Sequence, residues 1–402
     1  MTNRQLFLQH VAQTSPAPIG LEITRAEGIY MWDVQGKQYV DLISGFSVMN
    51  IGHGNERVKQ AIKQQVDDYM HLLVYGEIIE TPQVQYAKKL TEHLPSTLDC
   101  VYFTNSGTEA CEGAMKLAKR VTGRTQILAF NNAYHGSTQG ALSLMGGEYW
   151  RNAYRPLLPD VLHADFNTEA ALQDITCYTA AVVAEVVQAE AGARPARRAW
   201  LQALRQRCTD VGALLIFDEI QTSLWAFEQY GVVPDILLLG KALGGGLPLG
   251  AFIASWQHMQ QLTFNPVLGH ISTFAGHPVC CAAGLAGFEV LLQLANSEGA
   301  SHSFGAVLQQ EQLFRQHLQH PAIQAIHGRG LLLAVEFASP ALCQRICHAA
   351  VQAGLVTDWF LFAPHCLRIA PPLVMSAAQI EEVCQLLLSV IAAVASDSAA
   401  SH

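Results

Sequence analysis

The sequence predicts an α/β protein in which a large lobe is built on a mostly parallel sheet and a smaller lobe is α+β. From residue 100 to about residue 255, short runs of Val, Ile and Leu alternate with helical patterns, as is typical of strands buried on both faces of a sheet. Beyond about residue 290 the order changes to helix, strand pair, helix, strand and helix. The 402 residues also exceed the roughly 250–300 residues at which single hydrophobic cores stop growing. We therefore expect two lobes.

The large lobe is expected to begin with two amphipathic helices, over about 55–70 and 82–94, in which apolar residues recur at helical spacing. Its strands are short apolar runs separated by helical segments, an order that favours parallel pairing. We place these strands at residues 101–104, 127–130, 180–187, 213–217, 235–240 and 251–255.

The smaller lobe is expected to combine both ends of the chain. Residues 28–42 read as a β-hairpin, 331–337 as part of a strand pair, and 366–370 as a further strand. Ser376 and Gln379 form a capping-box pattern that predicts the start of the last helix. The expected boundaries are 49–290 for the large lobe, and 1–48 with 291–402 for the small lobe.

Composition excludes several classes of protein. Lys and Arg number 24 against 33 Asp and Glu, a net charge of −9, which argues against nucleic-acid binding because phosphate contacts need excess cations. A charged fraction of 14% with 50% hydrophobic residues indicates much buried surface. We expect no membrane-spanning segment, because no window of 18 or more apolar residues is free of Gly, Pro and polar breaks, and we expect no signal peptide. The ten cysteines have no CxxC pair and favour reduced thiols, so we expect a cytoplasmic protein without a membrane partner.

Lys241 is the only lysine after residue 119, and it follows the apolar run DILLLG. A lysine in apolar surroundings loses hydration, which lowers its pKa toward the range in which the amine is nucleophilic. This is the requirement for a lysine that forms a Schiff base. On position alone, a lysine that reaches solvent from a strand end is an equally good interpretation.

Asp218 ends another apolar run, ALLIFD, so both residues are expected at the carboxyl ends of core strands, where open α/β sheets bind ligands. A buried aspartate needs a cationic or hydrogen-bonding partner, and a protonated pyridine nitrogen is one. A structural carboxylate that caps a loop is the alternative interpretation.

Asn105-Ser106-Gly107-Thr108 lies between an expected strand and an expected helix. Backbone N–H groups at a helix N-terminus, with a glycine for close approach, form a phosphate site. An ordinary helix N-cap has the same pattern. The combination of this segment with Asp218 and Lys241 is therefore more informative than any one of them.

These residues belong to a series of motifs that resembles one enzyme family over nearly the whole chain. In order, the motifs are FTNSGTEACEGAMKLAKRVTGR, AYHGSTQGALSLMG, AEVVQAEAG, LLIFDEIQT, GVVPDILLLGKALGGGLPLGAF, HISTFAGHPVCCAAG and LRIAPPL. The chain resembles the class III aminotransferases, pyridoxal 5'-phosphate (PLP) enzymes with the aspartate-aminotransferase-like PLP-dependent transferase fold. This family includes the acetylornithine, ornithine and 4-aminobutyrate aminotransferases.

The resemblance implies roles for individual residues. Lys241 would hold PLP as a Schiff base and then move the proton between the amine-bearing carbon of the substrate and the cofactor. Asp218 would pair with the pyridinium nitrogen, and Gln221 would lie near the phenolic oxygen of the ring. The further cofactor-binding residues would be Ser106, Gly107 and Thr108 at the phosphate, Tyr134 stacked on the ring, its neighbour His135, and Thr273.

Thr273 would reach the phosphate in the neighbouring subunit, which implies a homodimer with shared active sites. Independently, residues 242–288 contain no Asp, Glu, Lys or Arg, and this suggests a large interface or, alternatively, a loop buried within one subunit. Arg368 would bind the carboxylate of an acid substrate through its guanidinium fork. Glu190 would pair with Arg368 when a substrate without that carboxylate is present.

The chain departs from the family pattern at four places. Ser137 stands where many relatives have a second carboxylate-binding arginine, and the usual glycine-rich segment with an arginine is missing after Thr222. Glu185 is not followed by the usual proline, and His277 replaces a common asparagine. The first two departures bear on which substrates the site accepts.

The sequence therefore predicts a PLP-dependent aminotransferase that moves an amino group from an amino acid or ω-amine donor to a 2-oxo acid by a ping-pong mechanism. An aminomutase or racemase on the same scaffold is an alternative. A PLP-binding pseudoenzyme is another, because of the shortened loop after Thr222. No metal ligand set is expected, since Cys343, Cys347 and His348 are better explained as residues of a packed helix.

Overall fold

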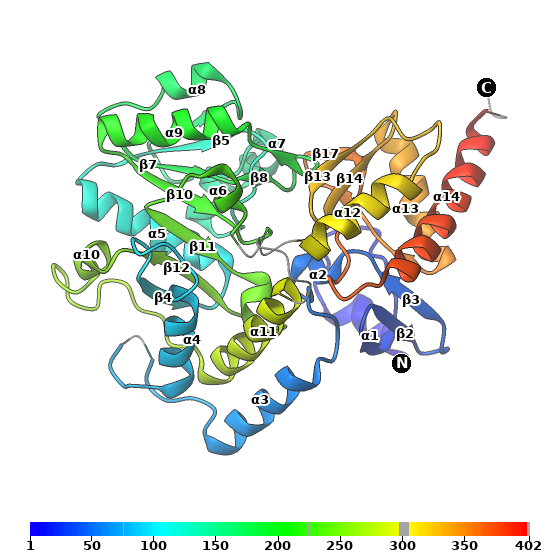
Figure 1. The fold of residues 1–402 in the computed structure, drawn as a ribbon, viewed down its shortest axis with the longest axis horizontal. Helices are drawn as coiled ribbons and strands as arrows, with labels where there is room; N and C mark the ends of the chain where they lie inside the picture. The colour runs from blue at the N-terminus through cyan, green and yellow to red at the C-terminus, as the bar shows by residue number, and fades with distance from the viewer. Residues whose placement is uncertain (75, 223–224, 297–304, 400–402) are drawn as a thin grey trace.

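A computed structural model describes residues 1–74, 76–222, 225–296 and 305–399. Its largest feature is a seven-stranded sheet, on the left in Figure 1, with the strand order β4-β12-β11-β10-β7-β5-β6. The strands are β4 (Cys100–Thr104), β5 (Gln126–Phe130), β6 (Val161–Ala164), β7 (Thr179–Ala184), β10 (Leu214–Asp218), β11 (Ile236–Leu239) and β12 (Gly250–Ala254).

Most neighbouring strands of this sheet run parallel. β10 pairs in parallel with β7 and β11, and β5 pairs in parallel with β6 and β7. β12 is antiparallel to both of its neighbours, β4 and β11. Every residue of β7, β10, β11 and β12 is buried, which explains the continuous apolar runs in the sequence. The predicted α/β fold with a mostly parallel central sheet is confirmed.

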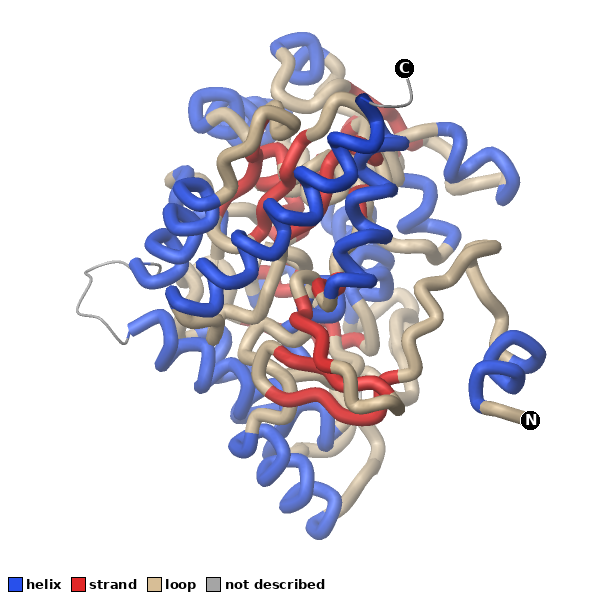
Figure 2. Tube along the Cα trace, turned by 90° about the vertical axis from the view of Figure 1, so that its right-hand side faces the viewer, coloured by secondary structure: helices blue, strands red, loops and turns tan. Residues whose placement is uncertain are grey.

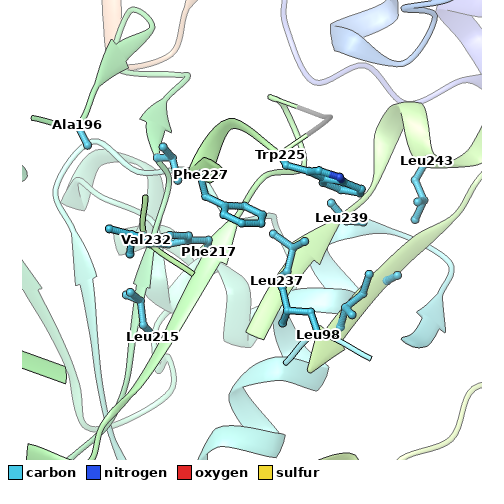
Figure 3. Close-up of a cluster of buried hydrophobic side chains, with 14 of the residues drawn as sticks. Leu98, Ala196, Leu215, Phe217, Trp225, Phe227, Val232, Leu237, Leu239 and Leu243 are labelled. Carbon is cyan, nitrogen blue, oxygen red and sulfur yellow. The ribbon is translucent and has the colours of Figure 1, made fainter. Parts of the chain in front are cut away.

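Helices cover both faces of the sheet. Alternate strand residues such as Ile216 and Leu238 pack with α5 (Gly107–Thr122), whereas their neighbours such as Phe217 and Leu237 pack with α9 (Arg198–Val211). Figure 3 shows Phe217, Leu237 and Leu239 meeting the aromatic side chains of the segment after β10. This packing fixes the strand ends just before the predicted site residues.

Two four-stranded sheets, on the right in Figure 1, combine both ends of the chain. In the first, the predicted hairpin of β2 (Tyr30–Asp33) and β3 (Gln38–Asp41) is confirmed, with β1 (Ile23–Glu27) and β15 (Leu355–Val356) on its sides. The second sheet contains β13 (Ala325–Arg329), β14 (Leu332–Glu336), β17 (Ala363–Ile369) and β16 (Trp359–Phe360). The lobe boundaries stay a prediction.

The remaining helices surround these sheets. They are α1 (Asn3–His10), α2 (Ser44–Ser47), α3 (Glu56–Asp68), α4 (Thr81–Thr91), α6 (Gln139–Leu144), α7 (Glu148–Arg151), α8 (Glu169–Gln173), α10 (Trp256–Met259), α11 (Pro278–Asn296), α12 (Gly305–His317), α13 (Pro340–Ala353) and α14 (Ala377–Ala399). In Figure 2, α1 stands apart from the body of the protein, and it buries none of its residues. The predicted capping box before α14 is present: Ser376 N–H donates to Gln379 Oε1 (2.8 Å), and Gln379 N–H donates to Ser376 Oγ (3.3 Å).

Two helices are long and apolar enough to cross a membrane by length and composition alone, with mean hydropathies of 1.6 over 278–295 in α11 and 1.5 over 377–396 in α14. α11 packs against α3 and α4, and α14 packs against α12 and α13. Core helices can have the same length and composition, so these two helices are weak evidence for a membrane-spanning segment.

The structure differs from the sequence prediction over residues 180–187. β7 ends at Ala184, and β8 (Val187–Gln188) pairs instead with β9 (Arg194–Pro195) in a separate two-stranded sheet. The break falls at Glu185, whose carboxylate accepts hydrogen bonds from the N–H groups of Ala189 (3.2 Å) and Tyr134 (3.3 Å). The pattern of apolar residues could not reveal this turn, because Glu185 and its neighbours are all buried.

Candidate active site

Asp218 and Lys241 lie at the ends of neighbouring parallel strands. Asp218 is the last residue of β10 and pairs with Leu238 of β11, and Lys241 begins the 3-10 helix η3 (Lys241–Gly244) after that strand. Both therefore lie at the carboxyl edge of the central sheet, where open α/β sheets bind ligands.

The Lys241 amine has surroundings that make it nucleophilic. Burial is the largest effect and lowers its pKa to about 8, while Glu190 raises the pKa and Arg368 lowers it. A fraction of the amine is then neutral near physiological pH, which a Schiff-base lysine needs. The backbone of Lys241 is left-handed, with φ of 49°, a conformation that concentrates at functional sites.

Asp218 is 6% exposed and is oriented by two hydrogen bonds. One joins its Oδ2 to His135 Nδ1 (2.7 Å), and the other comes from the N–H of Ile220 to Oδ1 (3.1 Å). His135 is buried, and its Nε2 has no hydrogen-bond partner among the described residues. A buried carboxylate held by a histidine and one amide suits a cationic ring nitrogen as its further partner.

The predicted phosphate cradle lies at the N-terminus of α5. Ser106 is the N-cap and accepts the N–H of Glu109 (3.3 Å), which leaves the first N–H groups of a 16-residue helix at this end. A Cβ at Gly107 would lie 2.5 Å from Ile220 Cδ1, so any larger residue would require the Ile220 side chain to move. The α5 start is thereby packed against the segment that follows Asp218.

The Tyr134–His135 segment also meets this cradle. Gly136 has φ of 126°, and a Cβ there would lie 2.3 Å from Thr108 Oγ1. Thr108 Oγ1 in turn shares a hydrogen bond with Thr138 Oγ1 (2.7 Å). The hydroxyl of Tyr134 lies 3.2 Å from Ser137 Oγ, so the serine that replaces the second arginine stands beside the predicted ring-stacking tyrosine.

Gln221 joins the cofactor side of the site to the substrate side. Its Nε2 donates to Glu190 Oε1 (3.3 Å), and its buried Oε1 has no partner in the described part of the chain. The shortened loop after Thr222 begins with residues 223–224, which lie outside the described residues. Glu219 holds the chain beyond them by accepting the N–H groups of Ala226 and Phe227 (2.7 and 2.6 Å), and burial raises its pKa to about 8.

Arg368 and Glu190 form a buried ion pair, as expected for the carboxylate-binding residues. Arg368 Nη2 donates to both carboxylate oxygens of Glu190, at 3.0 and 2.9 Å, and the two residues are 1% and 5% exposed. Glu190 also accepts the N–H of Leu361 (3.1 Å). Burial is the largest effect and acts to raise the pKa of Glu190, but the Arg368 charge, the Leu361 N–H, the Lys241 charge and the Gln221 amide together outweigh it, so the pKa is lowered.

Sequence reasoning missed three residues around Arg368. Its Nε donates to Asp358 Oδ1 (3.0 Å), and its guanidinium stacks 4.1 Å from the Phe360 ring and 5.3 Å from the Phe46 ring. Phe46 has a left-handed φ of 62°. No motif in the sequence marks these positions, because they lie on two segments, α2 and the stretch at β16, that only the fold brings to the arginine.

Thr273 is placed differently from the other predicted residues. It is exposed, in the segment before α11, and its neighbour Ser272 contacts the cradle region, where Ser272 Oγ accepts from Asn105 Nδ2 (2.9 Å). The structure brings together the other predicted residues, namely Ser106, Gly107, Thr108, Tyr134, His135, Glu190, Asp218, Gln221, Lys241 and Arg368.

The residues at the sheet edge fit PLP. Lys241, which is partly neutral near physiological pH, suits an aldehyde. The buried Asp218 carboxylate suits a pyridinium nitrogen, and the N-terminus of α5 suits a phosphate. The orphaned His135 Nε2 and Gln221 Oε1 are polar atoms that a polar ligand could satisfy.

Comparison with known proteins agrees with this geometry. The family model described as "Aminotransferase class-III" matches residues 11–391. The chain is 36% identical to a "[LysW]-aminoadipate semialdehyde/glutamate semialdehyde transaminase" of Sulfurisphaera tokodaii, with 86% of this chain and 90% of the relative covered. It is 34% identical to an acetylornithine aminotransferase of Bacillus subtilis, with 92% and 95% covered.

Solved structures show the same likeness. An ornithine aminotransferase from Toxoplasma gondii superimposes with a TM-score of 0.88 at 27% identity, covering 98% of this chain and 94% of that one. These comparisons do not favour the aminomutase, racemase or pseudoenzyme alternatives. The chain belongs to the class III aminotransferases, PLP-dependent enzymes that move an amino group from a donor to a 2-oxo acid.

Proposed function

We propose that Lys241 and Asp218 carry the transamination in this chain. When bound, PLP supplies an aldehyde that takes the amino group and a ring that withdraws electrons. Lys241 Nζ would hold the aldehyde end and then transfer the proton at the amine-bearing carbon of the substrate. Asp218 Oδ1 and Oδ2, oriented by Ile220 and His135, would keep the ring nitrogen protonated. The observation that carries this proposal is the position of both residues on adjacent strand ends.

The rest of the site would bind and orient. The α5 N-terminus with Ser106, Gly107 and Thr108 would hold the phosphate, and Tyr134 would cover one ring face. Arg368 would bind a substrate carboxylate after Glu190 turns away, which lets one pocket accept two different substrates in a ping-pong cycle. Ser137 offers no second cation, so we propose donors with at most one carboxylate that needs a charged partner.

A donor panel tests this function. Wild-type holoenzyme is mixed with amino acids and ω-amines, with pyruvate or 2-oxoglutarate as acceptor, and product formation is followed. Asp218→Asn keeps the shape of the side chain and removes its charge, and we expect its kcat to fall about 100-fold or more, as when a preorganised electrostatic group is removed. Turnover of no donor by the wild type, or full turnover by the Asp218→Asn variant, would contradict the proposal.

We further propose a homodimer in which Thr273 approaches the phosphate site of the second copy. Its support is the surface around Thr273, where large apolar side chains are exposed, among them Val267 (71%), Ile271 (49%) and Phe274 (56%). The ten cysteines are free, and only Cys177 is classed as exposed, which supports the proposed cytoplasmic location. Sedimentation analysis tests the dimer, and a monomer at micromolar concentration would contradict it.

A further inference from the structure

Arg368 contacts two carboxylates, those of Glu190 and Asp358. In the proposed function a substrate carboxylate takes the place of Glu190, and Asp358 has no part in that exchange. The five N–H donors of Arg368 divide clearly: Nη2 serves Glu190, Nε serves Asp358, and Nη1 is buried without a partner in the described chain. An incoming carboxylate that displaces Glu190 would find the edge formed by Nη1 and Nη2. Asp358 bonds to Nε and leaves Nη1 available.

Asp358 and Glu190 are attached to Arg368 in different ways. Glu190 reaches Arg368 from the loop between β8 and β9, two strands that follow β7 of the large sheet in the sequence. Asp358 belongs to the segment that pairs with the Arg368 strand: the N–H of Arg368 donates to the Asp358 carbonyl (2.9 Å), and Thr357 Oγ1 donates to the Arg368 carbonyl (2.6 Å). Asp358 therefore stays beside Arg368 when Glu190 leaves.

A fixed carboxylate has two opposite effects on carboxylate binding. The Nε bond and the Phe360 ring, 4.1 Å away, restrict how the guanidinium plane can turn. The negative charge of Asp358 also cancels part of the Arg368 charge, which weakens attraction for any further anion. The second effect distinguishes this site from one with a single arginine and a single exchanging glutamate.

We propose that Asp358 is a positioning and specificity-determining residue, which orients Arg368 and lowers its affinity for substrate carboxylates so that carboxylate-free amines compete well as donors. The proposal rests on the proposed function of Arg368 as the carboxylate-binding residue.

Protonation of Asp358 should act as a natural removal of its charge. The charged and titratable groups that face Asp358 are Arg368 on β17, Glu190 on the β8–β9 loop and Cys347 on α13. Burial raises the pKa of Asp358 to about 6, against the lowering by Arg368. As the pH falls through about 6, the competing charge is lost and carboxylate substrates should bind more tightly.

The test uses two donors that differ only where a carboxylate replaces a methyl group, alanine and 2-aminopropane. Half-reactions of the holoenzyme are followed by the cofactor spectrum at varied donor concentration. In Asp358→Asn, which keeps an oxygen for Nε, we expect KM for alanine to fall about tenfold because one opposing unit charge is gone. KM for 2-aminopropane should stay within about twofold. Asp210→Asn is the matched control and should change neither value, because Asp210 is exposed and its carboxylate accepts a hydrogen bond from Gln206 Nε2.

Asp358→Ala removes both the charge and the bond to Nε. We therefore expect the KM for alanine to fall less than in Asp358→Asn, or to rise. In the wild type alone, the ratio of the alanine and 2-aminopropane KM values should fall between pH 7 and pH 5.5, which keeps the test valid if a variant does not fold. An unchanged ratio in both Asp358→Asn and the wild-type pH series would overturn the role of Asp358. Failure of the wild type to convert either donor would instead overturn the proposed function.

Discussion

Replacing Arg368 with Met tests the ion-pair cluster that links the β8–β9 loop to the C-terminal sheet. Met keeps the apolar stem against Phe360 but removes all three charge-assisted hydrogen bonds, two to Glu190 and one to Asp358. The carboxylates of Glu190 and Asp358 then lose the Arg368 charge, although Glu190 is only 5% exposed. Breaking a buried pair by removing one partner costs about 3–5 kcal/mol, and we expect this loss in the free energy of unfolding at pH 7.

Urea unfolding of the holoenzyme, followed by fluorescence and circular dichroism, measures the loss. The control is Arg25→Met, because Arg25 pairs with Glu27 on the surface, where the side chains are 63% and 64% exposed. Surface pairs contribute about 0–1 kcal/mol, so the control should unfold close to the wild type. Equal midpoints for Arg368→Met and Arg25→Met would refute the reasoning.

The cost of Arg368→Met should also depend on pH. Without the arginine, burial leaves Asp358 with a folded-state pKa above its unfolded-state value, so the unfolded chain loses its proton first. The free energy of unfolding of the variant therefore falls as the pH rises from the unfolded-state pKa of Asp358 to its folded-state pKa. Lowering the pH from 7 to 5 lets the folded carboxyl keep its proton, and the difference from the wild type should shrink.

Two further outcomes follow from the geometry. The rate at which cofactor-free protein incorporates PLP should rise with pH and level off near pH 8, because burial lowers the Lys241 pKa to about 8; a profile still rising above pH 10 would contradict this. Gly113→Ala should lower the free energy of unfolding by about 1–3 kcal/mol, since its Cβ would lie 2.3 Å from Phe252 Cε1; urea unfolding checks it, and unchanged stability would show that the interface between α5 and β12 can yield.

The sequence was sufficient for the features that rest on local pattern. Buried strands appear as uninterrupted apolar runs, so β10 and β11 were located to within a residue or two, and Asp218 and Lys241 were placed at their ends. The Ser376 capping box was found for the same reason, because it depends on residues three positions apart. The motifs around Lys241 and Asp218 then indicated the family.

Features that depend on contacts distant in sequence were not predictable. Asp358 reaches Arg368 from a neighbouring strand segment, and Phe46 reaches it from the other end of the chain. Glu185 was hidden in an apolar run, although its carboxylate lies just after β7 and accepts the N–H of Tyr134, 51 residues earlier in the chain. In each case the fold determines which polar group meets which, and no spacing in the sequence records it.

The most direct test of the central claim is to find which lysine binds the cofactor. Borohydride reduction of the holoenzyme, followed by peptide mapping by mass spectrometry, locates the pyridoxyl group among the eight lysines of the chain. We expect it on the peptide that contains Lys241, and we expect Lys241→Ala to show no reduced adduct and no cofactor absorbance. An adduct on any other lysine of the wild type, or a persistent adduct in Lys241→Ala, would contradict the account.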